Sequence, residues 1–197
     1  MKLRGVIFDM DGTVFEVAYD WSRIRQELDT GGQPVLDHLS GLSEPQLSRK
    51  RRLLEEIEEQ ATSQAVLRAG MRALLDYLSL RGLVRALVTN NSRRNVDFLL
   101  EKYGLSFDCV LTRESGMWKP SAEPFRAALH HLGIDRKECC VVGDSRLDIH
   151  AAEEAGIDTI FILGLDEKEF APTGAVVCPD VRSLHGRIAS LVEVLGA

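Results

Sequence analysis

The sequence lacks the features that mark several specialised classes of protein. No apolar run approaches the roughly 20 residues that a membrane-spanning helix needs. No basic segment followed by an apolar one opens the chain, as it would in a secretory leader. The formal net charge of -6 provides no basic field for nucleic acid or for an anionic membrane. We therefore expect a cytoplasmic protein that binds neither nucleic acid nor membranes.

Cysteine is scarce, and its spacing argues against a zinc site. The four cysteines stand at positions 109, 139, 140 and 178, with no CxxC pair and no Cys/His spacing typical of zinc ligands. They lie in apolar runs that are typical of strands. We predict reduced, buried thiols that have no redox or metal-binding role.

What the sequence does contain is an apolar run that ends on two carboxylates. Residues 3–8 have no alternating polar face, which is typical of a strand that is covered on both sides in a parallel sheet. Asp9 and Asp11 follow at once, and Gly12 allows the chain to turn away. Ligands of open α/β sheets bind beyond the carboxyl ends of the strands, so both carboxylates are predicted to line a site. The alternative is a strand that stops at an ordinary acidic turn.

From residue 70 onward, helical and strand patterns alternate. Strands are predicted at 83–88, 109–112, 138–142 and 159–163, with a short edge strand at 176–177. Helices are predicted at 70–81, 93–103, 121–132, 145–155 and 181–195. Strands and helices in strict alternation imply right-handed crossovers and a parallel sheet. The predicted fold is therefore α/β, with a doubly wound, Rossmann-like parallel sheet.

The segment between the first two predicted strands interrupts this alternation, because its patterns are helical. Short helices are predicted at 22–28 and 34–42, and a long helix follows residues 43–46, whose Ser-Glu-Pro-Gln sequence is typical of a capping box. We predict an α/β core made of residues 1–15 and 70–197. Residues 16–69 are predicted to form a small all-α cap inserted into it.

Polar groups follow four of the predicted strands and should meet at one edge of the sheet. They are Asp9 and Asp11, then Thr89 and Asn90, then Lys119, and finally Asp144 with Asp148. Two like charges about 4 Å apart repel by about 4 kcal/mol at an effective dielectric near 20, so the carboxylates could not crowd together unaided. A divalent cation would remove this repulsion, and all-oxygen ligands suit Mg²⁺. Lys119 would supply further positive charge.

These segments resemble the four motifs of the haloacid dehalogenase superfamily of aspartate-nucleophile phosphohydrolases. Residues 9–13, DMDGT, match the family's DxDGT. Thr89 matches its threonine or serine, Lys119 its lysine, and the segment 143–148 its GDxxxD. Within the superfamily the chain looks most like phosphoglycolate-phosphatase-like members, whose helical cap is inserted between the first and second motifs. The insertion here is shorter than the usual helical cap.

The resemblance implies a Mg²⁺-dependent phosphatase that acts on a small phosphorylated metabolite. Asp9 would attack phosphorus and form an aspartyl phosphate, while Asp11 would serve as general acid and then general base. Thr89, the backbone around Asn90 and Lys119 would hold the phosphoryl oxygens. The implied metal site comprises Asp9, Asp11 through its backbone carbonyl, Asp144 and Asp148. Asp148 would ligate the metal through water or orient Lys119.

Two other functions remain open at this stage. A phosphosugar mutase of the same superfamily keeps all four motifs. A receiver-type signalling module also gathers carboxylates, a threonine and a lysine around Mg²⁺, but its phospho-acceptor aspartate follows a later strand, whereas residues 109–112 end without one. The substrate and the oligomeric state are left undetermined.

The first residues of the insertion are candidates for substrate recognition. Tyr19, Trp21, Arg23 and Arg25 come soonest after the catalytic loop. An aromatic ring beside two arginines could hold a small anionic or sugar-like leaving group. The alternative is that Trp21 anchors the core of the cap itself.

Overall fold

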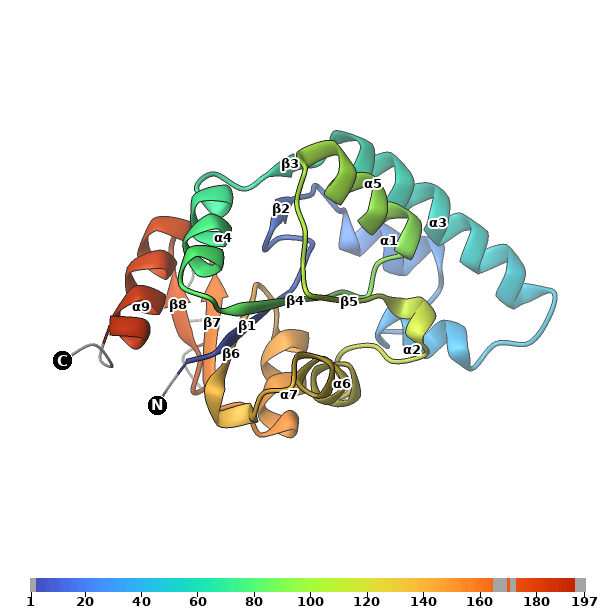
Figure 1. Ribbon diagram of the computed structural model, residues 1–197. Helices are drawn as coiled ribbons and strands as arrows, with labels where there is room; N and C mark the ends of the chain where they lie inside the picture. Colours follow the sequence, from blue (N-terminus) through green and yellow to red (C-terminus); the bar gives the residue numbers. More distant parts are fainter. Residues whose placement is uncertain (1–2, 165–169, 171–172, 194–197) are drawn as a thin grey trace.

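The computed structural model describes residues 3–164, 170 and 173–193. In that part of the chain, six strands form one parallel sheet in the order β5-β4-β1-β6-β7-β8 (Figure 1). Their bounds are β1 Gly5–Phe8, β4 Val84–Val88, β5 Cys109–Leu111, β6 Cys139–Gly143, β7 Thr159–Leu163 and β8 Val176–Cys178. The chain builds outward from β1 first in one direction and then in the other. The predicted α/β fold is confirmed.

The central strands end in register, which is what brings the predicted site residues together. Phe8 at the end of β1 pairs with Leu87 of β4 on one side and with Val142 of β6 on the other. Asp9, Thr89 and the turn after β6 therefore leave the sheet at the same edge. This edge includes the point where the strand order reverses, between β1 and β6, which is where ligands bind in open α/β sheets.

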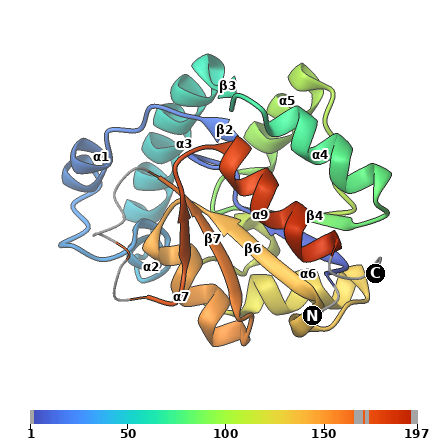
Figure 2. The same ribbon diagram turned by 90° about the vertical axis from the view of Figure 1, so that its left-hand side faces the viewer.

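Helices cover both faces of the sheet (Figures 1 and 2). On one face lie α4 (Met71–Leu80), α5 (Arg93–Tyr103) and α9 (Val181–Glu193). On the other lie α6 (Glu123–Leu132) and α7 (Arg146–Ala155). Two 3₁₀ helices, η1 (Arg113–Ser115) and η2 (Arg136–Glu138), were not predicted from the sequence. Three-residue helices are too short to produce a detectable periodicity.

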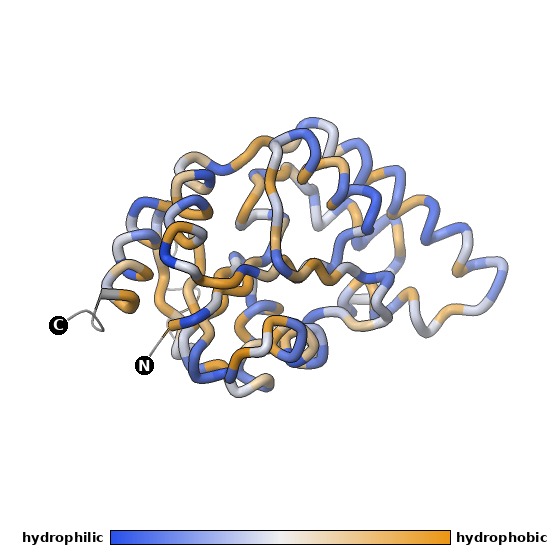
Figure 3. The backbone as a smooth tube through the Cα atoms, in the orientation of Figure 1, coloured by the Kyte–Doolittle hydropathy of each residue, from blue (hydrophilic) through white to orange (hydrophobic). Residues whose placement is uncertain are grey.

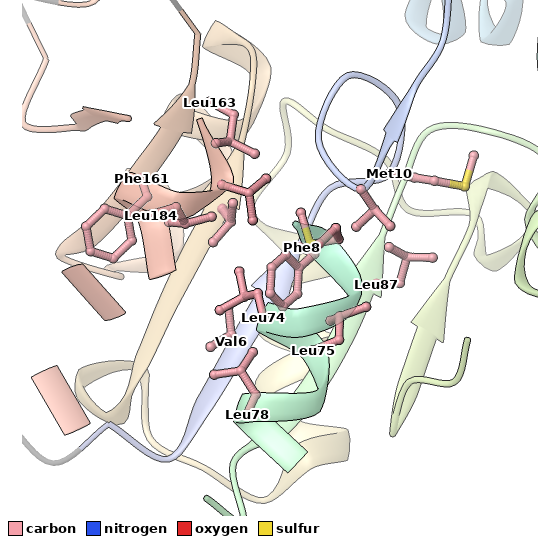
Figure 4. Packing of buried hydrophobic residues seen from close by; sticks show 14 of the residues in the cluster. Val6, Phe8, Met10, Leu74, Leu75, Leu78, Leu87, Phe161, Leu163 and Leu184 are labelled. Carbon is pink, nitrogen blue, oxygen red and sulfur yellow. The ribbon is translucent and has the colours of Figure 1, made fainter. Parts of the chain in front are cut away.

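Alternate residues of β1 enter two separate apolar cores. Val6 and Phe8 pack with Leu74 and Leu78 of α4 and with Leu184 of α9 (Figure 4). Ile7 belongs to the opposite core, together with Phe125 of α6 and Ile149 of α7. Because successive side chains of a strand point to opposite faces, a strand covered on both faces must be apolar throughout. This is the physical reason for the uninterrupted apolar run that precedes Asp9.

The helical segment between β1 and β4 is attached to the core through a two-stranded antiparallel pair, β2 (Phe15–Glu16) and β3 (Val66–Leu67). These two-residue strands were missed, because two residues cannot show an alternating pattern. Between them lie α1 (Trp21–Glu27), α2 (Val35–Ser40) and α3 (Gln46–Gln64). We call residues 17–65 the helical segment; it lies beyond the end of β1 (Figure 1). It has its own small cluster of Ile24, Leu28, Leu39 and Leu54.

Local details of the helical segment differ from the sequence-based expectation. The backbone tube is largely hydrophilic along α3 (Figure 3). The predicted capping box at the start of α3 is wrong: Pro45 occupies the N-cap position without a side-chain cap, and Glu44 Oε2 accepts from the Ser48 N–H at 3.3 Å instead.

The predicted burial of all four cysteines is confirmed, and none forms a disulfide. Within the described ranges, no helix combines the length and the apolar character required to span a membrane.

Two leucines of α4 offer a matched test of the core. Leu74 is fully buried against the sheet, whereas Leu80, the last residue of α4, is 86% exposed. We expect Leu74→Ala to lower the free energy of unfolding by about 2–5 kcal/mol, because it leaves a cavity. Leu80→Ala should change it by no more than about 0.5 kcal/mol. Urea unfolding followed by circular dichroism measures both, and equal losses would contradict the assigned packing.

Candidate active site

One lysine forms ion pairs with two carboxylates at the edge of the sheet. Lys119 Nζ lies 2.6 Å from Asp9 Oδ1 and 2.6 Å from Asp148 Oδ1, and all three side chains are buried. Burial alone would lower the pKa of Lys119, but the charges of Asp148 and Asp9 outweigh it and raise that pKa. The ammonium therefore stays charged and neutralises part of the negative charge around it.

Asn90 holds the backbone of Lys119 in place. The Asn90 side-chain amide donates to the Lys119 carbonyl oxygen at 2.8 Å, and the Lys119 N–H donates to Asn90 Oδ1 at 2.8 Å. The end of β4 thereby fixes a loop that follows β5. Asn90 was predicted as part of a phosphate site through its backbone, and its side chain has this additional structural contact. Neighbouring Thr89 is buried, and its Oγ1 accepts from the Asn91 N–H at 3.0 Å.

Asp148 is held from its other side by the start of α7. Its Oδ2 accepts from Ser145 Oγ at 2.6 Å and from the Ser145 N–H at 3.1 Å. A Cβ on Gly143 would lie 2.5 Å from the Asp148 side chain, so only glycine leaves room for it. Both carboxylate oxygens of Asp148 thus accept hydrogen bonds from protein groups. Asp148 is 0% exposed, so its side chain does not face solvent from the surface of α7.

Gly12 allows Asp144 to approach the turn after β1. Its φ is +79°, a conformation that other residues rarely adopt. A Cβ at this position would lie 1.9 Å from Asp144 Oδ2. The glycine of the DMDGT segment therefore meets two requirements at once, a left-handed turn and room for the carboxylate that directly follows β6.

The carboxylates form a group that could hold a cation. One oxygen each of Asp9, Asp144 and Asp148 lie within 4.8 Å of one another. Burial and the charge of Asp148 together raise the pKa of Asp144 to about 7. Burial likewise raises the pKa of Asp9, against the attraction of Lys119. One ammonium does not balance three carboxylates, so this all-oxygen set fits a hard divalent cation.

Asp11 lies beside this group in a different environment. Its Oδ2 accepts from Asn91 Nδ2 at 2.9 Å, and the same Nδ2 lies 3.0 Å from the hydroxyl of Tyr19. Asp11 Oδ1 is buried and accepts no hydrogen bond from any described residue. Burial raises the pKa of Asp11 to about 6, although the Asn91 hydrogen bond opposes the shift. A carboxyl group of this kind can exchange a proton near neutral pH.

Asn91 is a site residue that sequence reasoning missed. Its Oδ1 accepts from Asn95 Nδ2 at 2.9 Å and from the Ser92 N–H at 2.7 Å, so the orientation of its amide is determined. The only signal in the sequence is its position directly after Thr89 and Asn90. No motif distinguishes it from other asparagines in turns.

A pocket of about 980 Å³ opens between these residues and the helical segment. From the core it is lined by Asp9, Asp11, Thr89, Asn90, Asn91, Lys119, Asp144, Arg146 and Leu147. From the helical segment it is lined by Val17, Tyr19, Trp21, Arg25, Pro34, Val35, Leu36, Leu54 and Glu58. Of the two predicted arginines, only Arg25 reaches the pocket. Arg23 lies elsewhere on α1 and pairs with Glu27 at 2.6 Å.

Two contacts that sequence reasoning missed join the helical segment to the core loop before Lys119. Arg113 Nη1 of η1 lies 2.7 Å from Glu58 Oε2 of α3, and both side chains are largely buried. Trp118 Nε1 donates to Asp37 Oδ1 of α2 at 2.7 Å. In each pair the two residues are far apart in the sequence, and no local pattern signals that they meet. The loop that carries Lys119 is therefore in contact with the helices that roof the pocket.

Comparison with known proteins agrees with this arrangement. Residues 6–162 match the family of haloacid dehalogenase-like hydrolases. The chain belongs to this family. An N-acetylmuramic acid 6-phosphate phosphatase of Pseudomonas aeruginosa is 27% identical over 81% of this chain and 81% of its own length. A phosphoglycolate phosphatase of Rhodospirillum rubrum is 32% identical over 56% of this chain and 48% of its own.

The fold also matches that of solved structures. The crystal structure of a hydrolase from Pseudomonas syringae superposes with a TM-score of 0.79 at 24% identity, covering 95% of this chain and 98% of that one. At this level of identity the match concerns the fold. It includes the sheet whose carboxyl edge carries the acidic group, because the superposition spans nearly the whole chain.

Removal of the Lys119 ammonium tests the electrostatics of the site. We expect Lys119→Met to lower the free energy of unfolding by about 3–5 kcal/mol at neutral pH in the presence of a chelator, because it leaves buried carboxylates without their counter-charge. The matched control is Lys137→Met, which removes the ammonium of an exposed residue of η2 and should change stability by no more than about 0.5 kcal/mol. Chemical denaturation provides the measurement. Equal stability of the two variants would show that Lys119 does not hold the carboxylates together.

Proposed function

We propose that the protein is a Mg²⁺-dependent phosphatase that hydrolyses a small phosphomonoester metabolite through an aspartyl phosphate on Asp9. The observation that carries the proposal is the position of the Asp9 carboxylate, which lies at the end of β1, contacts Lys119 and belongs to the acidic group with Asp144. Membership of the hydrolase family supports it. So do the relatives that are phosphatases of small phosphorylated metabolites.

In the first half-reaction an Asp9 carboxylate oxygen attacks phosphorus, and the bond to the leaving oxygen breaks. The leaving oxygen takes a proton from Asp11, whose buried Oδ1 has no partner among the described residues. In the second half-reaction Asp11 takes a proton from water, which attacks the phosphorus of the aspartyl phosphate. Inorganic phosphate leaves, and the Asp9 carboxylate and the Asp11 proton are restored.

The different roles of Asp9 and Asp11 follow from the different surroundings of their carboxyl groups. Asp9 must be ionised to attack, and the nearby Lys119 ammonium stabilises its negative charge. Asp11 must carry a proton at the start, and burial raises its pKa to about 6. Thr89 and the backbone around Asn90 would hold the phosphoryl oxygens, as the family motifs imply. Lys119 would neutralise charge that develops on those oxygens.

We propose that Asp9 and Asp144 are carboxylate ligands of the metal and that the backbone carbonyl of Asp11 is a third. When bound, Mg²⁺ would neutralise charge on the carboxylates and on the phosphoryl group. Asp148 was predicted as a member of the metal site. Since both of its oxygens accept hydrogen bonds from protein groups, we propose that it acts mainly by orienting Lys119.

The helical segment would act as a cap. We propose that residues 16–69 form this domain, with residues 1–15 and 70–197 as the core. A roof of this kind excludes water and contacts the leaving group, while the core holds the phosphoryl group. The predicted mutase alternative differs in outcome, since it would convert a sugar phosphate into its isomer instead of releasing phosphate. Assay of both products from one sugar phosphate distinguishes the two functions.

The first prediction of this proposal concerns the metal. Hydrolysis of p-nitrophenyl phosphate should stop on addition of EDTA and resume when excess Mg²⁺ is supplied, because the carboxylates need a counter-charge before they can accept an anionic substrate. Release of p-nitrophenolate measures the rate. Undiminished activity in a metal-depleted preparation would contradict the proposal.

The second prediction separates the two aspartates that follow β1. Asp9→Asn should form no phosphoenzyme, because it removes the nucleophile. Asp11→Asn keeps the nucleophile and should accumulate phosphoenzyme from p-nitrophenyl phosphate, whose leaving group needs no proton, and then stall. Acid quenching and mass spectrometry of the two variants detect the added phosphoryl group. A phosphoryl group on the Asp9→Asn protein would mean that another residue is attacked.

A further inference from the structure

One side of the pocket is more apolar than recognition of a phosphate requires. Beyond the carboxylates and Lys119, the helical segment contributes Trp21, Pro34, Val35 and Leu36 to the lining, and α7 contributes Leu147. A volume of about 980 Å³ lies near the upper end of the roughly 300–1,000 Å³ range of ligand pockets. A two-carbon leaving group would leave most of this space and most of these walls without contact.

Trp21 is placed to contact a ligand instead of supporting the helical segment. It lines the pocket and remains 44% exposed, and it is absent from the apolar cluster formed by Ile24, Leu28 and their neighbours. One contact of its ring is with Tyr19, at 4.9 Å between centroids. Tyr19 is in turn fixed through Asn91, next to Asp11. The expectation that Trp21 anchors a core within the cap is thus not supported.

Arg25 lies one helical turn after Trp21 on the same face of α1, because residues four apart in a helix are neighbours. It also lines the pocket. Within the described ranges of the chain, no hydrogen bond or ion pair engages its guanidinium. Arg23, by contrast, lies outside the pocket and is paired with Glu27. The pocket therefore offers Arg25 as a cation for a second anionic group, separate from the phosphoryl group that the proposed mechanism places at the core.

We infer that the substrate is a ring-bearing phosphomonoester that carries a second negative group, such as a carboxylate, on its leaving portion. This inference rests on the proposed phosphatase function and names its substrate class. The phosphoryl group binds at Asp9 and Lys119, the ring lies against Trp21, and the second anionic group meets Arg25. A guanidinium suits this role because it binds a carboxylate through two parallel hydrogen bonds.

Three probes separate the features of this substrate class. 4-Carboxyphenyl phosphate has both the ring and the second charge, phenyl phosphate has the ring alone, and phosphoglycolate has the charge without the ring. Each variant is compared with the wild type on the same probe, so that differences in leaving-group reactivity cancel. Release of inorganic phosphate is measured for all three, and kcat/KM is the quantity compared.

Arg25→Ala should lower kcat/KM for 4-carboxyphenyl phosphate about tenfold, which is the effect of one lost charged contact, and leave phenyl phosphate within about twofold. Arg25→Lys should recover part of the loss. Trp21→Ala should lower kcat/KM for both ring-bearing probes and leave phosphoglycolate nearly unchanged. The matched control is Arg23→Ala, which removes an arginine from the same helix outside the pocket and should affect no probe.

The outcomes distinguish this inference from the function on which it rests. A wild-type protein that hydrolyses none of the probes with Mg²⁺ would overturn the phosphatase proposal and the inference with it. A wild-type protein that hydrolyses phenyl phosphate, but whose Arg25→Ala variant loses the same factor on both ring-bearing probes, would overturn the inference alone. Circular dichroism of each variant, compared with that of Arg23→Ala, identifies losses caused by misfolding.

Discussion

The contact of Lys119 with Asp9 and Asp148 is the interaction on which the rest of the site depends. It joins the loops that follow β1 and β5 to the first turn of α7 through a single buried ammonium. Such an arrangement is unfavourable unless each charge has partners, since taking ions out of water costs several kcal/mol apiece. The structure supplies those partners locally: Asn90 holds the backbone of Lys119, and Ser145 holds the second oxygen of Asp148. Lys119 and Asp148 are thus each held by further hydrogen bonds.

The site also depends on close packing at the carboxyl edge of the sheet. Gly12 and Gly143 both stand where a Cβ would meet a carboxylate, at 1.9 Å from Asp144 and 2.5 Å from Asp148. The two glycines allow backbone and carboxylate to approach more closely than any side chain would permit. Because the central strands are apolar on both faces, this crowded polar edge rests on a rigid support. Precise placement of the site therefore begins in the core, several residues before Asp9.

The helical segment is coupled to this edge through contacts that also border the pocket. Glu58 pairs with Arg113 and Asp37 accepts from Trp118, so α3 and α2 both contact the loop that leads to Lys119. Tyr19 reaches Asn91, which holds Asp11. A movement of the helical segment would consequently change the surroundings of both Lys119 and Asp11. The same segment supplies the apolar wall and Arg25, whose guanidinium has no hydrogen bond or ion pair among the described residues, so the proposed catalysis and the proposed substrate choice both involve this segment.

The sequence by itself determined the parallel α/β sheet and the segments after four of its strands in which Asp9, Thr89, Lys119 and Asp144 stand. Those features follow from local patterns: apolar runs, helical periodicity, and carboxylates directly after a strand. Only the tertiary structure decided which side chains meet across long separations. Asn91 and Asp11 are 80 residues apart, and Trp118 and Asp37 are 81 apart. It also decided that the face of α1 bearing Trp21 and Arg25 lines the pocket while Arg23 points elsewhere. Periodicity defines the faces of a helix, but the packing of that helix against its neighbours determines which face meets the ligand.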